Sequence, residues 1–291
     1  MKMLNKNAGI KGVSPTKEVL RRLVKDKVAM LGLIIFTLEI LIAVFGPLLV
    51  KADPYEMNFS ETLMAPCKEH ILGTDDLGRD IFSRIVTGAR YSLGLGLSVV
   101  LFSTLLGTII GSLVGYFGGV VDLVVMRICD IFQSIPPLLM SVAISAALGQ
   151  GFFNTLIALS LGSTIGTVRL LRGSIMKIRS EEFLEAADLI SCSKFRTIVT
   201  HVLPNSFSPV IVRSTMGIAN AIMSASTLSF IGLGIQQPTP EWGGMLSGAR
   251  KFMRKCPWMI IYPGLAIAIT VLALNLLGDG LRDAMDPRMK D

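Results

Sequence analysis

Charged residues are scarce in this sequence, and hydrophobic residues are abundant. Only 17% of the 291 residues are charged, whereas 51% are hydrophobic, and the mean hydropathy is +0.62. Ordinary soluble domains carry about a quarter charged residues, so this balance indicates a membrane-embedded protein. The net charge of +7 does not indicate nucleic-acid binding, because eight of the basic residues precede Val28, where they bias membrane topology.

The residue patterns that common enzymes need are missing as well. No glycine is followed by lysine, which excludes a P-loop for ATP, and the chain has no nucleophile elbow and no Cys-x-x-Cys motif. The two histidines, His70 and His201, are predicted on opposite sides of the membrane. We therefore expect no catalytic residue, no metal site and no cofactor in this chain. Cys67 and Cys256 both fall in predicted external loops, where free thiols are favoured over a disulfide.

Six apolar runs are long enough to cross about 30 Å of hydrocarbon as helices of roughly 20 residues. The basic N-terminus is expected in the cytoplasm. Counting spans from it places a second basic cluster, residues 169–196, in the cytoplasm too. The two clusters agree, so both chain ends are predicted to be cytoplasmic. The runs are 28–50, 91–116, 122–148, 153–171, 207–232 and 258–277.

One all-α membrane domain is predicted to account for the whole chain. The first apolar run is interpreted as an uncleaved helix, because it is too long for a signal peptide and no A-x-A site follows it. The predicted sections are a basic cytoplasmic N-terminal segment (1–27), the first transmembrane helix (28–50), an external loop (51–90), a five-helix core (91–278) that contains a cytoplasmic loop (180–205), and a cytoplasmic tail (279–291).

Glu39, Arg127 and Asp130 are candidate functional residues inside predicted spans, where a charge near the bilayer centre costs about 2.5–3.5 kcal/mol. Arg127 and Asp130 lie three residues apart on one helix face and are predicted to form a structural ion pair. Glu39 is expected to face protein or water. Glu39 has two possible roles, a structural hydrogen bond to a neighbouring helix and a part in transport. The sequence favours the first at least as much as the second.

The third apolar run is interrupted by Pro136 and Pro137. Broken membrane helices are tolerated where neighbouring protein or a water-filled cavity satisfies the freed backbone groups. We take these two prolines and Met223 of the fifth run as candidates for lining a pathway. A purely structural kink is the alternative.

Three further patterns predict local structure. Gly107, Gly111 and Gly115 recur every four residues and predict a close helix contact, with a partner helix in this chain or in another. Residues 81–86 predict an amphipathic helix, which either lies along the membrane surface or serves as a packed connector. The glycines and prolines of residues 232–244 predict an ordered external loop without regular helix.

The stretch from Ser180 to Asn205 is the only long, charged, helix-forming segment between two apolar runs. Its apolar residues recur at helical spacing, which predicts two short amphipathic helices. The first is expected to begin at Ser180. The second is expected to be capped by Ser193 and stopped by Pro204.

This segment resembles the EAA loop of ABC-importer permease subunits, in which Glu-Ala-Ala is followed at fixed spacing by a glycine and then by Leu-Pro. Ser191 stands at the glycine position, and serine has a higher cost than glycine at positive φ. The motifs HILGTDDLGRD, MRICD followed by SIPPLLM, GLGIQQPTPEWGGML and LGDGLRDAMDPR are similar to the second permease subunit of the dipeptide/oligopeptide/nickel importer family. The residues that match the EAA loop are Glu185, Ala186, Ala187, Leu203 and Pro204.

The resemblance implies the type I ABC-importer permease fold, with six transmembrane helices and a cytoplasmic coupling helix. In that family the coupling helix sits in a groove on a separate ATPase subunit. An apolar helix face would fill that groove, and Glu185 would find a polar or basic partner there. The implied coupling residues are Phe183, Glu185, Ala186, Ala187, Ile190, Ser191, Leu203 and Pro204.

The resemblance implies three kinds of protein partner: a homologous permease, two ATP-binding subunits that use ATP and magnesium, and an extracellular substrate-binding protein. It also implies that the chain lies in the lipid of a bacterial or archaeal cytoplasmic membrane. No nucleic-acid partner is implied. The implied function is ATP-driven import of dipeptides or oligopeptides. Nickel or another small solute is the alternative within the family. A stand-alone channel or secondary transporter, or a structural scaffold, is a more distant alternative.

Overall fold

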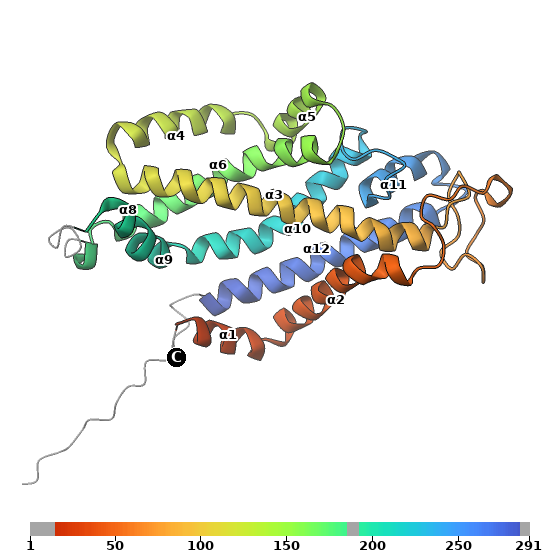
Figure 1. Cartoon of the computed structure of the whole chain (residues 1–291), viewed down its shortest axis with the longest axis horizontal. Coiled ribbons are helices and arrows are strands. Elements are labelled where there is room, and N and C mark those ends of the chain that lie inside the picture. The colour runs from red at the N-terminus through yellow and green to blue at the C-terminus, as the bar shows by residue number, and fades with distance from the viewer. Residues whose placement is uncertain (1–14, 185–191, 286–291) are drawn as a thin grey trace, which may run out of the picture.

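Long helices that run side by side dominate the molecule (Figure 1). The structure is a computed structural model that describes residues 15–184 and 192–285. Within these ranges the regular elements are all helical, so the predicted all-α fold class is confirmed. The elements are α1 Pro15–Lys25, α2 Lys27–Leu49, η1 Phe59–Glu61, α3 Ile81–Phe117, α4 Gly119–Gln133, α5 Pro137–Leu148, α6 Phe152–Ile178, α8 Lys194–Thr197, the π-helical turn η2 Ile198–Val202, α9 Leu203–Ser206, α10 Ser208–Phe230, α11 Trp242–Ala249, η3 Arg250–Phe252 and α12 Trp258–Met285.

Each predicted span corresponds to one long helix, except the third, which is divided into α4 and α5. In the described part of the chain, α2, α3 and α12 are each long and apolar enough to cross a membrane, and the bent pair α4 and α5 adds a fourth candidate. The more polar helices α6 and α10 fall outside this set. The helices therefore follow the predicted order, and the number of six crossings stays a prediction.

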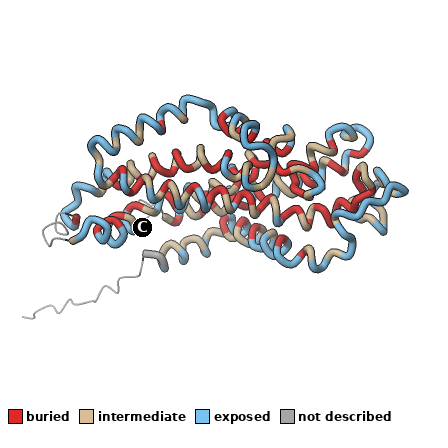
Figure 2. Tube along the Cα trace, turned by 45° about the horizontal axis from the view of Figure 1, so that its top comes forward, coloured by how far each residue is buried: buried red, intermediate tan, exposed pale blue. Residues whose placement is uncertain are grey.

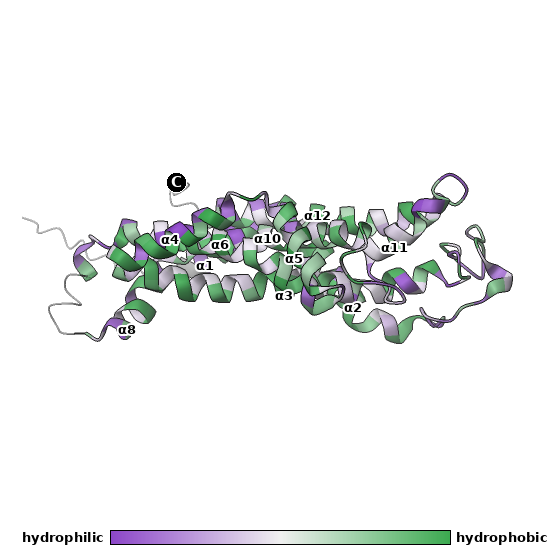
Figure 3. Ribbon diagram, turned by 90° about the horizontal axis from the view of Figure 1, so that it is seen from above, coloured by the Kyte–Doolittle hydropathy of each residue, from purple (hydrophilic) through white to green (hydrophobic). Residues whose placement is uncertain are grey.

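The outer surfaces of these helices are apolar. Figure 3 shows hydrophobic residues over most of the long helices, with hydrophilic residues gathered in the connecting loops. Large side chains such as Leu48, Leu101 and Val120 are more than two-thirds exposed. Such a surface is suited to contact with lipid chains.

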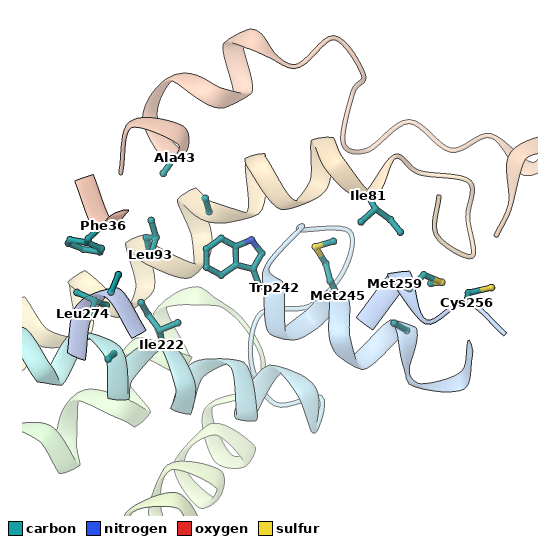
Figure 4. Packing of buried hydrophobic residues seen from close by; sticks show 14 residues of the cluster. Phe36, Ala43, Ile81, Leu93, Ile222, Trp242, Met245, Cys256, Met259 and Leu274 are labelled. Atoms are coloured by element: carbon teal, nitrogen blue, oxygen red, sulfur yellow. The ribbon is translucent and has the colours of Figure 1, made fainter. Parts of the chain in front are cut away.

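Buried residues concentrate where the central helices face one another, while α4 is largely exposed (Figure 2). The largest apolar cluster joins α2, α3, α10, α11 and α12. In Figure 4, Trp242 lies near the centre of this cluster, with Leu93 and Ile222 to one side and Met245 to the other. The cluster therefore fixes α11 against the ends of the long helices.

The three glycines spaced by four residues face α6 of the same chain. A Cβ atom on Gly107 would lie 2.5 Å from the Thr167 Cβ, and one on Gly115 would lie 2.9 Å from the Ile175 Cβ. A Cβ atom on Gly111 would lie 3.0 Å from a backbone oxygen of α6. The predicted close contact is therefore confirmed, and its partner helix is identified as α6.

The amphipathic stretch 81–86 forms the first turns of α3 and does not lie along the membrane surface as a separate helix. Asp80 caps α3 by accepting a hydrogen bond from the Ser83 backbone N–H at 2.7 Å, and Ile81 is buried in the main apolar cluster. The packed alternative is therefore correct. These first turns belong to α3 because their apolar residues pack against the buried residues of the main apolar cluster.

The glycine-rich loop after the fifth span contains a helix that we did not predict. Glu241 caps α11 by accepting hydrogen bonds from the backbone N–H groups of Gly243 and Gly244, at 2.9 and 2.7 Å. A Cβ atom on Gly243 would lie 2.5 Å from the Ser226 Cα. The prediction of a loop without regular helix was wrong here because Gly243 permits close packing against α10 and does not break the helix.

Candidate functional site

The predicted coupling segment lies at one end of the molecule, where α8 and α9 lead from α6 toward α10 (Figure 1). Phe183 is 39% exposed, whereas its neighbour Leu184 is buried against α6 and α10. This pattern is typical of an amphipathic helix, and the coupling role of Phe183 stays a prediction. The candidates outside the described residues are Glu185, Ala186, Ala187, Ile190 and Ser191.

The second part of this segment is helical through Leu203 and Pro204 up to Ser206. The prediction that Pro204 stops this helix was therefore wrong. Proline is tolerated in the first turn of a helix, where its missing N–H is not needed, and Pro204 occupies that position in α9. The π-helical turn before it is closed by a hydrogen bond from the Leu203 backbone N–H to the Ile198 carbonyl.

The apolar residues of α8 and η2 divide between two faces. Ile198 and Val202 are buried, whereas Phe195 is 78% exposed and Val199 is 45% exposed. Phe195 and Val199 lie four residues apart and therefore share a helix face. This face therefore leaves two apolar side chains uncovered within the described residues.

The predicted break in the third span is confirmed. The axes of α4 and α5 differ by 86°, and Pro136 and Pro137 lie exposed at the start of α5. Met223 is 51% exposed on α10, on the same face as the exposed Asn220 and Thr227. Whether these residues line a pathway stays a prediction.

The predicted pair of Arg127 and Asp130 is present, with 3.6 Å between Nη1 and Oδ2, but both side chains are largely exposed. Asp130 makes a closer ion pair with Arg169 of α6. Arg172 of α6 likewise donates hydrogen bonds to both carboxylate oxygens of Asp122. We did not predict these ties between α4 and α6, because one sequence does not indicate which helix faces meet.

Glu39 lies at the contact between α2 and α12. Its Oε1 accepts a hydrogen bond from the Thr270 hydroxyl at 2.9 Å. Of the two alternatives, the structure therefore provides the hydrogen bond to a neighbouring helix.

At the opposite end, a network of buried charges joins the 51–80 loop to the loop that precedes α11. Arg79 donates from Nε to Asp75 at 2.7 Å and also binds the Gln237 side chain. Arg84 donates from Nη1 to the Pro54 carbonyl at 2.8 Å. Buried charges need such partners because desolvation is costly. The sequence signal was the clustering of acids and arginines after His70.

His70 bridges two carboxylates in the same loop. Its Nδ1 lies 3.0 Å from Asp80 Oδ1, and its Nε2 lies 3.3 Å from Glu61 Oε2. The hydrogen bond with Asp80 is the largest cause that raises the pKa of His70 above its ordinary value. Nearby, Cys67 and Cys256 are free thiols, as the sequence favoured.

A pocket of about 500 Å³ opens at the end of the molecule that carries α11, and we call it the outer pocket. Two hydrogen bonds tie its rim together: Gly151 N–H donates to the Gly234 carbonyl at 3.2 Å, and Gln150 Nε2 donates to the Gly232 carbonyl at 2.9 Å. Sequence reasoning missed the pocket because three separate segments build it. Its lining residues are Tyr91, Gln150, Gly151, Phe152, Ile235, Gln236 and Thr239.

Two family models match this chain. Residues 107–291 match the model described as binding-protein-dependent transport system inner membrane component. Residues 14–66 match the model described as the N-terminal transmembrane domain of oligopeptide transport permease C. Together they cover the first span and the helical core from residue 107 onward.

Curated relatives match over nearly the whole chain. The dipeptide transport system permease protein DppC of Alkalihalophilus pseudofirmus is 46% identical over 96% of this chain and 91% of its own length. The di/tripeptide transport system permease protein DppC of Pseudomonas aeruginosa is 41% identical, over 96% and 94%. The glutathione transport system permease protein GsiD of Escherichia coli is also 41% identical, over 95% and 92%.

Among solved structures, a chain of the MetNI methionine ABC transporter in an inward-facing conformation is similar. The TM-score is 0.56 at 16% identity, and the match covers 70% of this chain and 97% of that chain. At this identity the likeness concerns the fold alone. It agrees with the type I permease fold that the sequence predicts.

Proposed function

The chain belongs to the family of binding-protein-dependent transport system inner membrane components, and we propose that it is a permease subunit of an ATP-driven importer of dipeptides or oligopeptides. The observation that carries the substrate class is the 46% identity, over 96% of the chain, to a dipeptide transport permease. The glutathione permease relative supports it, because glutathione is itself a tripeptide.

In this proposal the chain forms half of a translocation pathway beside a homologous permease. Two separate ATP-binding subunits bind and hydrolyse ATP with magnesium, and an external substrate-binding protein delivers the peptide. Both termini and the 180–205 segment face the cytoplasm, so the 51–80 loop and α11 face outward. The basic residues near the N-terminus and around α6 and α8 support this orientation.

Coupling is proposed to run through the cytoplasmic segment. Leu184 and Val202 of that segment pack against Leu171 and Ile175 of α6 and against Val210 of α10. Protein interiors are close-packed and transmit displacements. A partner that moves this segment would therefore also move the cytoplasmic ends of α6 and α10. Motion of these two helices relative to α4 and α5 would open the pathway to one side at a time.

The function is tested by uptake of labelled dipeptides and oligopeptides, measured beside labelled nickel, in cells with and without this chain. Loss of peptide uptake alone is expected. Loss of nickel uptake alone would retain the importer and overturn the substrate class. Unchanged uptake of every solute would contradict a role in import.

A further inference from the structure

We propose that the outer pocket binds the backbone of a peptide at the external end of the pathway and does not select among its side chains by charge. The choice of a peptide as ligand rests on the proposed function. The site itself is inferred from the position, lining and rim of the pocket.

The position of the pocket links it to the candidate pathway. Gln150 and Gly151 follow directly on α5, which begins at Pro137. Ile235 and Gln236 follow on α10, which carries Met223. The two spans that the sequence marks as pathway walls therefore both end at this pocket. A ligand that left the pocket toward the cytoplasm would meet the walls of these spans.

The lining combines apolar side chains, such as Phe152 and Ile235, with hydrogen-bonding groups. None of the lining residues is charged. Tyr91, Gln150 and Gln236 supply hydroxyl and amide groups, and such groups both donate and accept hydrogen bonds as a peptide backbone does. The volume of about 500 Å³ falls within the roughly 300–1,000 Å³ of small-molecule sites. A charged side chain or a charged chain terminus would find no opposite charge here, so the internal amide groups are the part of a peptide backbone that this lining can satisfy.

The rim positions these groups before a ligand arrives. The Gln150 side chain is oriented by its donated hydrogen bond to Gly232. In the described part of the chain, its amide oxygen, the Gln236 amide oxygen and the Thr239 hydroxyl make no hydrogen bond. A pre-oriented site loses less conformational entropy on binding. The two amide oxygens are therefore the proposed acceptors for peptide N–H groups, and the Thr239 hydroxyl is the proposed donor to a peptide C=O group.

The 51–80 loop reaches the same pocket. The hydroxyl of Tyr55 lies 3.3 Å from the hydroxyl of Tyr91. Burial is the first cause that raises the pKa of Tyr55 to about 12, and a phenol with even its ordinary pKa of about 10 is neutral near pH 7.

The first test fills the pocket in the complete transporter, reconstituted with its partner subunits and a saturated substrate-binding protein. Thr239→Trp should lower dipeptide uptake about tenfold or more, because the bulky ring excludes the ligand by steric clash. Leu101→Trp, which adds the same ring at an exposed site of α3 outside the lining, is the control and should retain uptake. Dipeptides with acidic, basic and neutral side chains should lose uptake by the same factor. A loss confined to one charge class would contradict backbone recognition.

The second test uses Gln236→Ala, which removes the amide and adds no bulk. This variant should lower uptake of an ordinary dipeptide, and it should have no further effect on an N-methylated dipeptide, which lacks the backbone N–H. A dipeptide with a photoreactive side chain should crosslink to residues 150–152 or 235–239. If Thr239→Trp prevents assembly, Gln236→Ala and the crosslink decide the question.

The two proposals fail in different ways. Wild-type rates in Thr239→Trp and Gln236→Ala, with an intact complex, would overturn the pocket and leave peptide import standing. Crosslinks confined to other residues would do the same. A wild-type transporter that takes up no peptide would overturn the proposed function itself.

Discussion

The two ends of this molecule are built in different ways. The end that carries α11 is held by buried charges and helix caps, with Arg79, Arg84 and Glu241 among its most buried large side chains. At the end with α8 and α9, a small apolar cluster of five buried residues holds the segment to α6 and α10. Exposed apolar residues such as Phe195 remain outside that cluster.

This difference indicates which end depends on another protein. A buried charge without a partner is costly, so the network around Asp75 must be complete within the chain. A small cluster with exposed apolar neighbours is locally less stable, as is common in segments that move or bind. We infer that the α11 end is rigid by itself and that the coupling end gains stability from its partner.

The largest effect is expected at the coupling end. Charge reversal by Glu185→Lys, or the bulky change Ala187→Trp, should abolish uptake while the protein stays in the membrane, because the changed face would no longer fit its partner. Labelled peptide uptake and immunodetection in membrane fractions measure the two properties. Asp283→Lys, a charge reversal at an exposed site of α12, is the control and should transport normally. Unimpaired uptake in both coupling variants would contradict the coupling role.

At the α11 end, Asp75→Ala should destabilise the fold. The substitution leaves Arg79 and Arg84 buried without their carboxylate, and breaking a buried pair typically costs about 3–5 kcal/mol. Thermal unfolding of the purified protein in detergent measures the loss. Glu18→Ala is the control, because it removes a pair with Arg22 on α1, outside the predicted spans, and such surface pairs are worth about 0–1 kcal/mol. Equal losses of thermal stability in the two variants would show that the buried network stabilises the fold no more than a surface ion pair does.

Much of the fold followed from the sequence because its signals are local. Apolar runs marked the spans, and Pro136 and Pro137 marked the break because they lack the N–H that a helix needs. The resemblance to an EAA loop predicts a coupling segment from a short run of neighbouring residues, and its coupling role stays a prediction. These features depend on residues that are close together in the chain.

The features that the sequence did not predict depend on distant residues. The pairing of Asp122 with Arg172 joins positions 50 residues apart, and the outer pocket combines three segments. Gly243 and Gly244 were misinterpreted because a glycine that breaks a helix and a glycine that permits close packing look alike in one sequence. Pro204 was misinterpreted because its effect depends on whether it lies inside a helix or in the first turn.

The connection between the two ends is tested at the contact of α3 with α6. A Cβ atom on Gly107 would lie 2.5 Å from the Thr167 Cβ, so Gly107→Ala should overpack the contact and cost about 1–3 kcal/mol. Gly94→Ala in the same helix is the matched control, because a Cβ atom on Gly94 would have no neighbour within 4 Å. Thermal unfolding should separate the two variants. If they behave alike, the contact between α3 and α6 is looser than the structure indicates.

The smallest effect on stability is expected from the titration of His70. It distinguishes the two ends of the molecule, because it makes the stability of the α11 end depend on pH. The pKa of His70 is raised above 6.5 in the folded state, first by the hydrogen bond with Asp80. Its contribution to stability is therefore complete below about pH 6.5 and is lost as the pH rises through the raised folded-state pKa. Thermal unfolding between about pH 5.5 and 8.5 should show this loss in the wild type and a smaller pH dependence in His70→Gln. His201→Gln, at the coupling end, should retain the wild-type profile. Identical profiles in all three proteins would mean that the bridge from His70 to Glu61 and Asp80 does not hold the loop.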